Sequence, residues 1–234
     1  MRILAIGAHP DDIELCCGGS LAKFAAQGHA IGIAVMTDGA TGSSTIPSEQ
    51  LVPMRKSEAE SSAKLICAKF YWLGFPDGKL ENCVDTCLAV NKVIRDFNPD
   101  LIITHNPEDY ISDHRKTSQL AVDAGLWSKV GPLIPEVRAL DHSPAIAFME
   151  SLAGVNFIPE RYIDISDHFE MKRRMLACHV SQGAWLADYG GIDNMETIEV
   201  SCRYRGIQCG VRYAEGFRIW HGWQTAKAEP VMPS

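Results

Sequence analysis

The sequence predicts an α/β fold in a single domain, with a mostly parallel sheet and helices on both of its faces. Three observations support this prediction. The 234 residues are enough for one substantial core. Short apolar runs alternate with amphipathic stretches, and each of these runs ends in a polar loop. This β-α-β-α order is typical of parallel strands joined by right-handed crossovers.

The first half of the chain supplies the clearest elements. Strands are expected at the short apolar runs, which are residues 2–8, 30–39, 69–78 and 100–109. Helices are expected where apolar residues recur at helical spacing, at 19–28, 50–68, 82–97 and 114–129. Ser112 or Asp113 is expected to cap the last of these helices.

The second half has a weaker pattern. Strands are expected at "AIAFME" (145–150) and "RYIDIS" (161–166), and a helix at "DHFEMKRRMLACHV" (167–180). Residues 181–213 are rich in Gly, Ser and Arg and predict no clear element. Because no repeat or linker interrupts the chain, we expect one domain over residues 1–234, with a more variable part from about residue 140.

Composition restricts the partners. The 22 Lys and Arg residues against 29 Asp and Glu residues argue against nucleic acid, which binds clustered basic side chains. No apolar run is long enough to cross a bilayer, and the first apolar run lacks a small-residue cleavage site. We therefore expect a small-molecule partner, no membrane association, a cytoplasmic location and eight reduced cysteines.

Polar clusters follow the four expected strands. They are residues 9–12, 37–39, 76–78 and 105–109. The carboxyl ends of parallel strands share one edge of the sheet, and ligands bind in the crevice beyond that edge. The sequence therefore predicts that these four segments converge on one site.

The first cluster lies in "IGAHPDDIELCCGGSLA", residues 6–22. It lacks the glycine spacing of a dinucleotide loop and the Gly-Lys-Ser/Thr of a P-loop, and its two acids would repel phosphate. A metal site uses these residues more fully. His9 and Asp12 share a turn stiffened by Pro10, and His114 is the best third ligand from the same edge.

The neighbouring acids then have separate tasks. Asp11 would stay uncoordinated and take a proton from a water whose pKa zinc lowers to about 7. Asp113 could orient a ligand or cap its helix. Taken singly, His9 and His114 are each more often ordinary cap or core histidines than metal ligands. Two histidines with an Asp-Asp pair at converging strand ends favour a metal more, so both interpretations stay open on spacing alone.

Several segments resemble successive motifs of one family, in order along residues 2 to about 217. They are "AHPDDIELCCGGSLA", "MRKSEAE", "GFPDG", "NPDLIITHNPEDYISDHRKT", "KRRMLACHVSQ" and "GVRYAEGF". The family is that of the LmbE-like or PIG-L zinc-dependent de-N-acetylases. The resemblance implies a Rossmann-like (LmbE-like) fold, Zn²⁺ as cofactor, and hydrolysis of an N-acetyl group, usually on an N-acetylglucosamine unit, to a free amine and acetate.

The resemblance also implies roles by position. His9, Asp12 and His114 match the three zinc ligands, Asp11 matches the general base, and Arg55 matches an arginine implicated in substrate binding. From the residues alone, Arg55 is equally a charge on a solvated helix face.

One departure from the family affects the chemistry. Many family deacetylases carry a histidine at the position of Ile111, where it stabilises the oxyanion or protonates the leaving amine. Isoleucine can do neither. His105 and Tyr110 are candidate substitutes, and zinc with Asp11 alone is another solution. Asp109, Asp77 and residues 179–182 match family positions and are expected only to shape the site, Asp109 as a possible orienting carboxylate.

Three functions follow as hypotheses. The leading one is a zinc amidohydrolase acting on an amino sugar derivative or a related small N-acyl compound. The second is a zinc-dependent hydratase of a small unsaturated carboxylic acid, and the third is a non-catalytic sugar or nucleotide binder. The number of associating chains is open, a homo-oligomer included.

Overall fold

The computed structural model describes residues 1–182 and 193–222. Its strands are β1 (Arg2–Gly7), β2 (Ala30–Thr37), β3 (Lys69–Phe75), β4 (Leu101–Thr104), β5 (Ala145–Met149), β6 (Arg161–Asp164) and β7 (Ala214–Ile219). Its α-helices are α1 (Asp12–Ala26), α2 (Ser48–Leu65), α3 (Val84–Phe97), α4 (Ser112–Trp127), α5 (Phe169–Leu176) and α7 (Asn194–Cys209). Short 3₁₀ turns are η1 (Gly131–Leu133), η2 (Leu152–Gly154) and η3 (Ser166–His168).

The described strands form one seven-stranded sheet in the order β3-β2-β1-β4-β5-β7-β6. The first five of these strands are parallel, which confirms the predicted mostly parallel sheet. β7 runs antiparallel to both β5 and β6. The chain builds outward from β1 to β3 and then returns to β4 on the other side. The topological switch point, where ligands bind in such sheets, therefore lies between β1 and β4.

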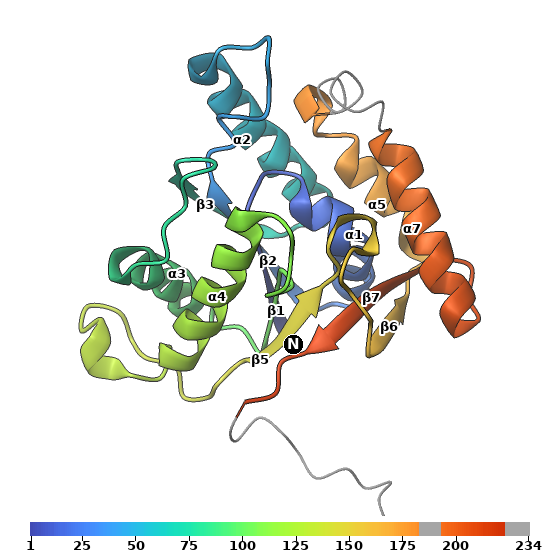
Figure 1. Cartoon of the computed structure of the whole chain (residues 1–234). Coiled ribbons are helices and arrows are strands. Elements are labelled where there is room, and N and C mark those ends of the chain that lie inside the picture. The colour runs from blue at the N-terminus through green and yellow to red at the C-terminus, as the bar shows by residue number, and fades with distance from the viewer. Residues whose placement is uncertain (183–192, 223–234) are drawn as a thin grey trace, which may run out of the picture.

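The alternation of side chains along β1 produces two cores. Ile3 and Ala5 pack toward α1, α2 and α5, whereas Leu4 and Ile6 pack toward α3 and α4. Figure 1 shows the two groups of helices on opposite sides of the sheet. A strand covered on both faces must be apolar throughout, which explains the continuous run "ILAIG".

Three expectations about helices were wrong, and the strand β7 was not expected. The first helix begins at Asp12 rather than at residue 19, so the Gly18-Gly19 pair lies inside α1. The last helix of the first half begins at Ser112 with Ile111 as its N-cap residue, so neither Ser112 nor Asp113 caps it. α7 was not predicted, because only a narrow stripe of this helix is buried.

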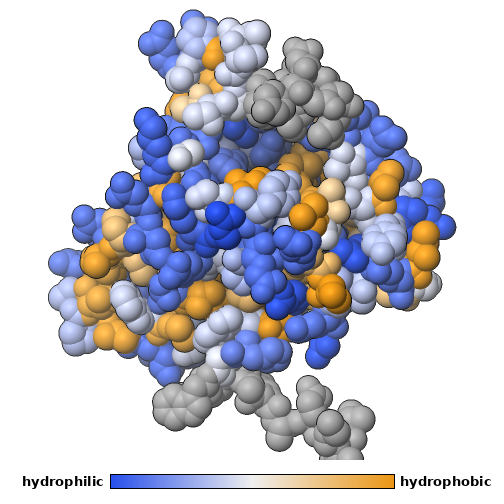
Figure 2. All heavy atoms as spheres, in the orientation of Figure 1, coloured by the Kyte–Doolittle hydropathy of each residue, from blue (hydrophilic) through white to orange (hydrophobic). Residues whose placement is uncertain are grey.

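The face of the molecule drawn in Figure 2 is mainly hydrophilic. Figure 2 shows hydrophobic residues on this face in scattered groups among polar ones. No helix among the described residues combines the length and the apolar character needed to span a membrane. All eight cysteines are unpaired.

Candidate metal centre

The candidate site lies beyond the carboxyl ends of β1 and β4, at the switch point of the sheet. The turn after β1 carries His9, Asp11 and Asp12, and the first turn of α4 carries His114. Asp11 has a φ of 112°, which L residues rarely adopt. Such strained backbone persists only where surrounding contacts hold it, and it clusters at functional sites.

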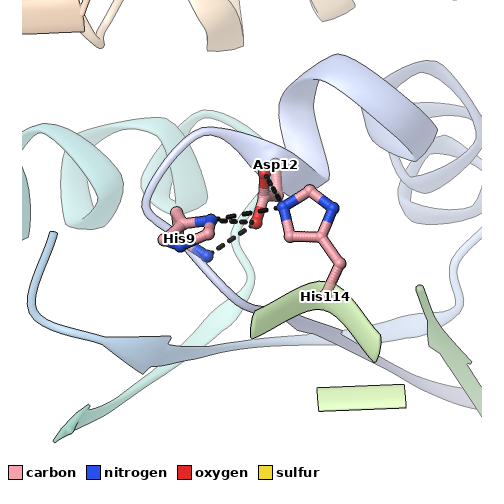
Figure 3. Close-up of side chains that lie close together, drawn as sticks. All are labelled: His9, Asp12 and His114. Atoms are coloured by element: carbon pink, nitrogen blue, oxygen red, sulfur yellow. Dashed lines mark hydrogen bonds and ion pairs between the residues drawn. The ribbon is translucent and has the colours of Figure 1, made fainter. Parts of the chain in front are cut away.

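Ligand atoms of His9, Asp12 and His114 converge beside this turn (Figure 3). The Asp12 carboxylate lies between two imidazole rings, with Oδ2 3.2 Å from His9 Nδ1 and Oδ1 3.2 Å from His114 Nε2. The two ring nitrogens are 3.2 Å apart. One ligand atom from each residue lies within 4.8 Å of the other two. Two histidines and a carboxylate form a ligand set that catalytic metals use.

A carboxylate holds each imidazole from behind. Asp109 Oδ2 lies 3.1 Å from His114 Nδ1, and Asp77 Oδ1 lies 3.1 Å from His9 Nε2. The second oxygen of Asp77 accepts hydrogen bonds from the backbone N–H and the hydroxyl of Thr41. Carboxylates in this position fix the ring and its tautomer, and they leave the opposite nitrogen for a metal.

The charges and donors of these residues fit a cation. Burial alone would lower the pKa of His114, but Asp12 and Asp109 raise it to about 9. Burial opposes ionisation of Asp12, yet His114 and His9 hold its pKa well below the usual range. The carboxylates therefore attract positive charge to the point where the three ligand atoms meet. A metal ion can take the place of the imidazole protons there.

His105 lies behind His114, and the two rings stack with centroids 3.9 Å apart. Its Nε2 accepts a hydrogen bond from the backbone N–H of Ala8 at 2.9 Å, which leaves the ring proton on Nδ1. Burial and the neighbouring His114 lower the pKa of His105 to about 4. His105 therefore packs against His114 as a neutral ring, its Nε2 also lies 3.3 Å from Asp12 Oδ2, and an acid role for it stays a prediction.

Asp11 is buried next to the ligands. Burial raises its pKa to about 6, although the charge of Arg55 acts in the opposite direction. The Arg55 guanidinium lies 3.5 Å from Asp11 Oδ1 and donates to the carbonyls of Pro10 and Gly39. Because Arg55 is 2% exposed, its guanidinium is occupied by the protein's own turn. Substrate binding by Arg55 stays a prediction, and the contacts add a role in holding Asp11.

The remaining candidates lie at the start of α4. Asp113 Oδ2 accepts the backbone N–H of Gly78 at 2.8 Å and lies 3.8 Å from His9 Nε2. Ile111 is partly buried, and its N–H donates to Asp109 at 2.9 Å. Tyr110 is 51% exposed. Of the two proposed substitutes for the family histidine, Tyr110 is the one that is accessible to a ligand.

Three residues around the site have no specific role that sequence pattern alone predicts, and they are Asp77, Glu14 and His179. Asp77 orients His9. The sequence feature that could have indicated this contact is its Pro-Asp-Gly turn, which was expected at the same edge of the sheet as the first polar cluster. His179 Nε2 lies 3.3 Å from Glu14 Oε1, and both side chains are buried directly behind the turn. No local pattern could have linked positions 14 and 179, because only the fold brings them together.

Known proteins resemble the chain in sequence and in structure. A family model described as PIG-L, GlcNAc-PI de-N-acetylase, matches residues 4–125. The diacetylchitobiose deacetylase of Thermococcus kodakarensis is 28% identical over 94% of this chain and 84% of its own length. The 4-oxalmesaconate hydratase of Pseudomonas putida is 23% identical over 76% of this chain and 73% of its own length. The structure of N,N'-diacetylchitobiose deacetylase from Pyrococcus horikoshii, complexed with its inhibitor MPG, has a TM-score of 0.82 and 26% identity over 94% of this chain and 83% of that chain.

Proposed function

The chain belongs to the PIG-L family, and from this premise we propose that it is a zinc-dependent de-N-acetylase. Its substrate is an amino sugar of the N-acetylglucosamine type or a related small N-acyl compound, and its products are a free amine and acetate. One observation carries the proposal. His9, Asp12 and His114 converge within the reach of a single ion, next to the buried carboxylate of Asp11.

His9, Asp12 and His114 hold the metal in this proposal. Asp77 and Asp109 orient the two imidazoles, so that each ring directs a lone pair toward the metal. A zinc ion supplies Lewis-acid chemistry, since it polarises the acyl carbonyl and makes water a stronger acid.

Asp11 carries the proton. Burial raises its pKa to about 6, so the carboxylate can both accept and return a proton near neutral pH. It takes a proton from water as the water oxygen bonds to the acyl carbon. It then returns that proton to the nitrogen as the C–N bond breaks. Water and amide thus yield carboxylic acid and amine, with no other reactant.

Ile111 predicts a modest rate. The side chain offers neither a proton nor a charge, so Asp11 returns the proton alone, and Tyr110 is the candidate donor to the developing oxyanion. Loss of one oxyanion donor costs about 10²- to 10³-fold in kcat. We therefore expect slower turnover than in a family member that has the histidine.

A second function, hydration of a small unsaturated carboxylic acid, is supported by Ile111 together with the similarity to 4-oxalmesaconate hydratase. Hydration needs no proton transfer to a leaving amine. Acetate release from N-acetylated sugars, compared with loss of the double bond in unsaturated acids, separates the two activities. A non-catalytic binder would show neither activity and no stoichiometric metal.

Asp11→Asn tests the proposal. The variant should keep its metal content, because Asp11 is not a ligand, while acetate release falls by about 10²- to 10⁴-fold. Asp141→Asn is the matched control, since its side chain is 83% exposed and far less constrained. Equal activity of Asp11→Asn and the wild-type protein would refute the role of Asp11. Absence of bound zinc in wild-type protein that has been loaded near neutral pH would refute the proposed metal site.

A further inference from the structure

Two charged residues from the C-terminal half enter the interior beside α1. Lys172 lies on α5 and Glu215 on β7, and their side chains are 0% and 2% exposed. Lys172 Nζ lies 2.6 Å from Glu215 Oε1. Burial opposes ionisation of the ammonium group, but the Glu215 carboxylate raises the pKa of Lys172, so the residues form a charged pair. The proposed chemistry uses neither of them.

This ion pair bonds to the backbone of α1 in the middle of the helix. The Lys172 ammonium donates to the carbonyl of Leu15 at 2.8 Å. The Glu215 carboxylate accepts the N–H groups of Gly19 at 3.0 Å and Ser20 at 2.7 Å. In an uninterrupted helix these N–H groups would bond to carbonyls four residues earlier. The ion pair therefore binds the Leu15 carbonyl and the Gly19 N–H, two groups that are each other's partners in a regular helix, and so fixes the middle of α1 to α5 and β7.

One glycine of the Gly18-Gly19 pair makes these contacts with α1 possible. A Cβ atom at Gly19 would lie 2.6 Å from Ile165 Cδ1 and 3.1 Å from Glu215 Oε1. A Cβ atom at Gly18 would lie 3.6 Å from Lys172 Cγ, which is ordinary contact. Gly19 therefore provides the close approach by which the carboxylate reaches the helix backbone.

The same backbone segment continues to the candidate site. The N–H of Leu15 donates to the carbonyl of Asp11 at 2.9 Å. Lys172 therefore binds the carbonyl of Leu15, and the N–H of the same residue binds the carbonyl of Asp11. The strained φ of Asp11 needs such external support, because strained conformations persist only where their surroundings fix them.

We propose that Lys172 and Glu215 are positioning residues for Asp11 and Asp12, acting through an ion pair that is hydrogen-bonded to the backbone of α1. This inference rests on the proposed function, since it assigns the pair to the turn that holds the metal and moves the proton. It also explains why a lysine and a glutamate are buried together far from solvent, where apolar residues would fill the same space.

The double variant Lys172→Met/Glu215→Met tests this inference. It removes both charges at once, and replacement of a buried ion pair by apolar residues of similar volume often leaves stability unchanged. Without the pair, the Leu15 carbonyl and the Gly19 and Ser20 N–H groups lose these partners, and the first turn of α1 can shift. We expect about 10- to 100-fold weaker metal binding, as for outer-shell substitutions, and a loss in kcat at saturating metal with little change in KM. Lys172→Arg should recover part of both losses.

The control is Lys69→Met/Asp96→Met. That ion pair has the same 2.6 Å separation, but its side chains are 53% and 54% exposed. The control double variant should leave metal affinity and kcat unchanged. If the Lys172 and Glu215 double variant also keeps metal affinity and kcat within twofold of wild type, the inference is overturned and the pair only stabilises the fold.

Hydrogen exchange separates this inference from the proposed function. The Leu15 amide should exchange faster in the double variant, whereas amides of α3 should not change. That local effect supports the positioning role even if the wild-type protein releases no acetate, which would count against the proposed function alone. Equal exchange at Leu15 in both proteins, or equal acceleration in α3, overturns the positioning role.

Discussion

Asp77→Asn tests the outer layer of the candidate site, because the two side chains have nearly the same shape. In the wild-type protein the two carboxylate oxygens serve different partners. Oδ1 lies 3.1 Å from His9 Nε2, and Oδ2 accepts the Thr41 N–H at 3.0 Å and the Thr41 hydroxyl at 2.7 Å. A carboxylate can accept from both sides, whereas an amide has one acceptor and one donor group.

In either orientation, the asparagine side chain disrupts the contact with Thr41 or the contact with His9. If its oxygen faces His9, its NH₂ group is directed at the Thr41 N–H, and two donors oppose each other. If its NH₂ group faces His9, Nε2 must accept and the ring proton moves to Nδ1, the nitrogen that faces Asp12 and His114. A protonated nitrogen cannot bind a metal. Hydrogen bonds to charged groups contribute about 1.5–3 kcal/mol, so we expect about 10- to 100-fold weaker metal binding.

The assay is metal titration against a chelator of known affinity, with the wild-type protein and the exposed Asp141→Asn variant alongside. Asp141 forms only an exposed ion pair, so its variant should bind metal as the wild-type protein does. Unchanged affinity in Asp77→Asn would mean that Asp77 does not select the His9 tautomer. The orientation of His9 would then have to come from Asp12 and Asp113.

Two further predictions follow from contacts around the same turn. Gly19→Ala should lower the free energy of unfolding by about 1–3 kcal/mol, because its Cβ would overlap Ile165. The control Gly131→Ala meets nothing within 4 Å, so thermal and denaturant unfolding should show little change in its free energy of unfolding. Arg55→Gln should move the acid limb of the kcat/KM pH profile to higher pH, because Arg55 lowers the pKa of Asp11 and the base must be ionised. An unchanged acid limb would mean that Arg55 does not control the ionisation of Asp11.

Much of the fold follows from local pattern. The apolar run of β1, continuous because both of its faces are covered, and the helical spacing in α2 and α3 predicted a parallel sheet with helices on both sides. α7 lacked such a signal. Its better signs were the capping residue Asp193, which accepts the Met195 N–H at 2.8 Å, and Gly210 with a φ of 78° at its C-terminal end.

The start of α1 shows the limit of local reasoning. Glycines lower helix propensity, and the sequence predicted a helix that begins only at Gly19, the second residue of the Gly-Gly pair. The helix instead begins at Asp12, and Glu215 occupies the space that Gly19 leaves open. Tertiary contacts thus outweigh a propensity cost of about 1 kcal/mol per glycine.

The sequence by itself determined the order of strands and helices in the first half of the chain, the edge of the sheet where polar residues gather, and the residue types expected to bind a metal. Only the tertiary structure decided which partners those residues have. Asp77 faces His9, Asp109 faces His114, and Lys172 with Glu215 holds α1. Periodicity depends on residues a few positions apart, whereas Asp77 lies 68 positions beyond His9 and Glu215 lies 196 beyond Gly19. Such pairs meet only when the sheet and its helices pack, because burial and hydrogen bonding between distant segments bring them together.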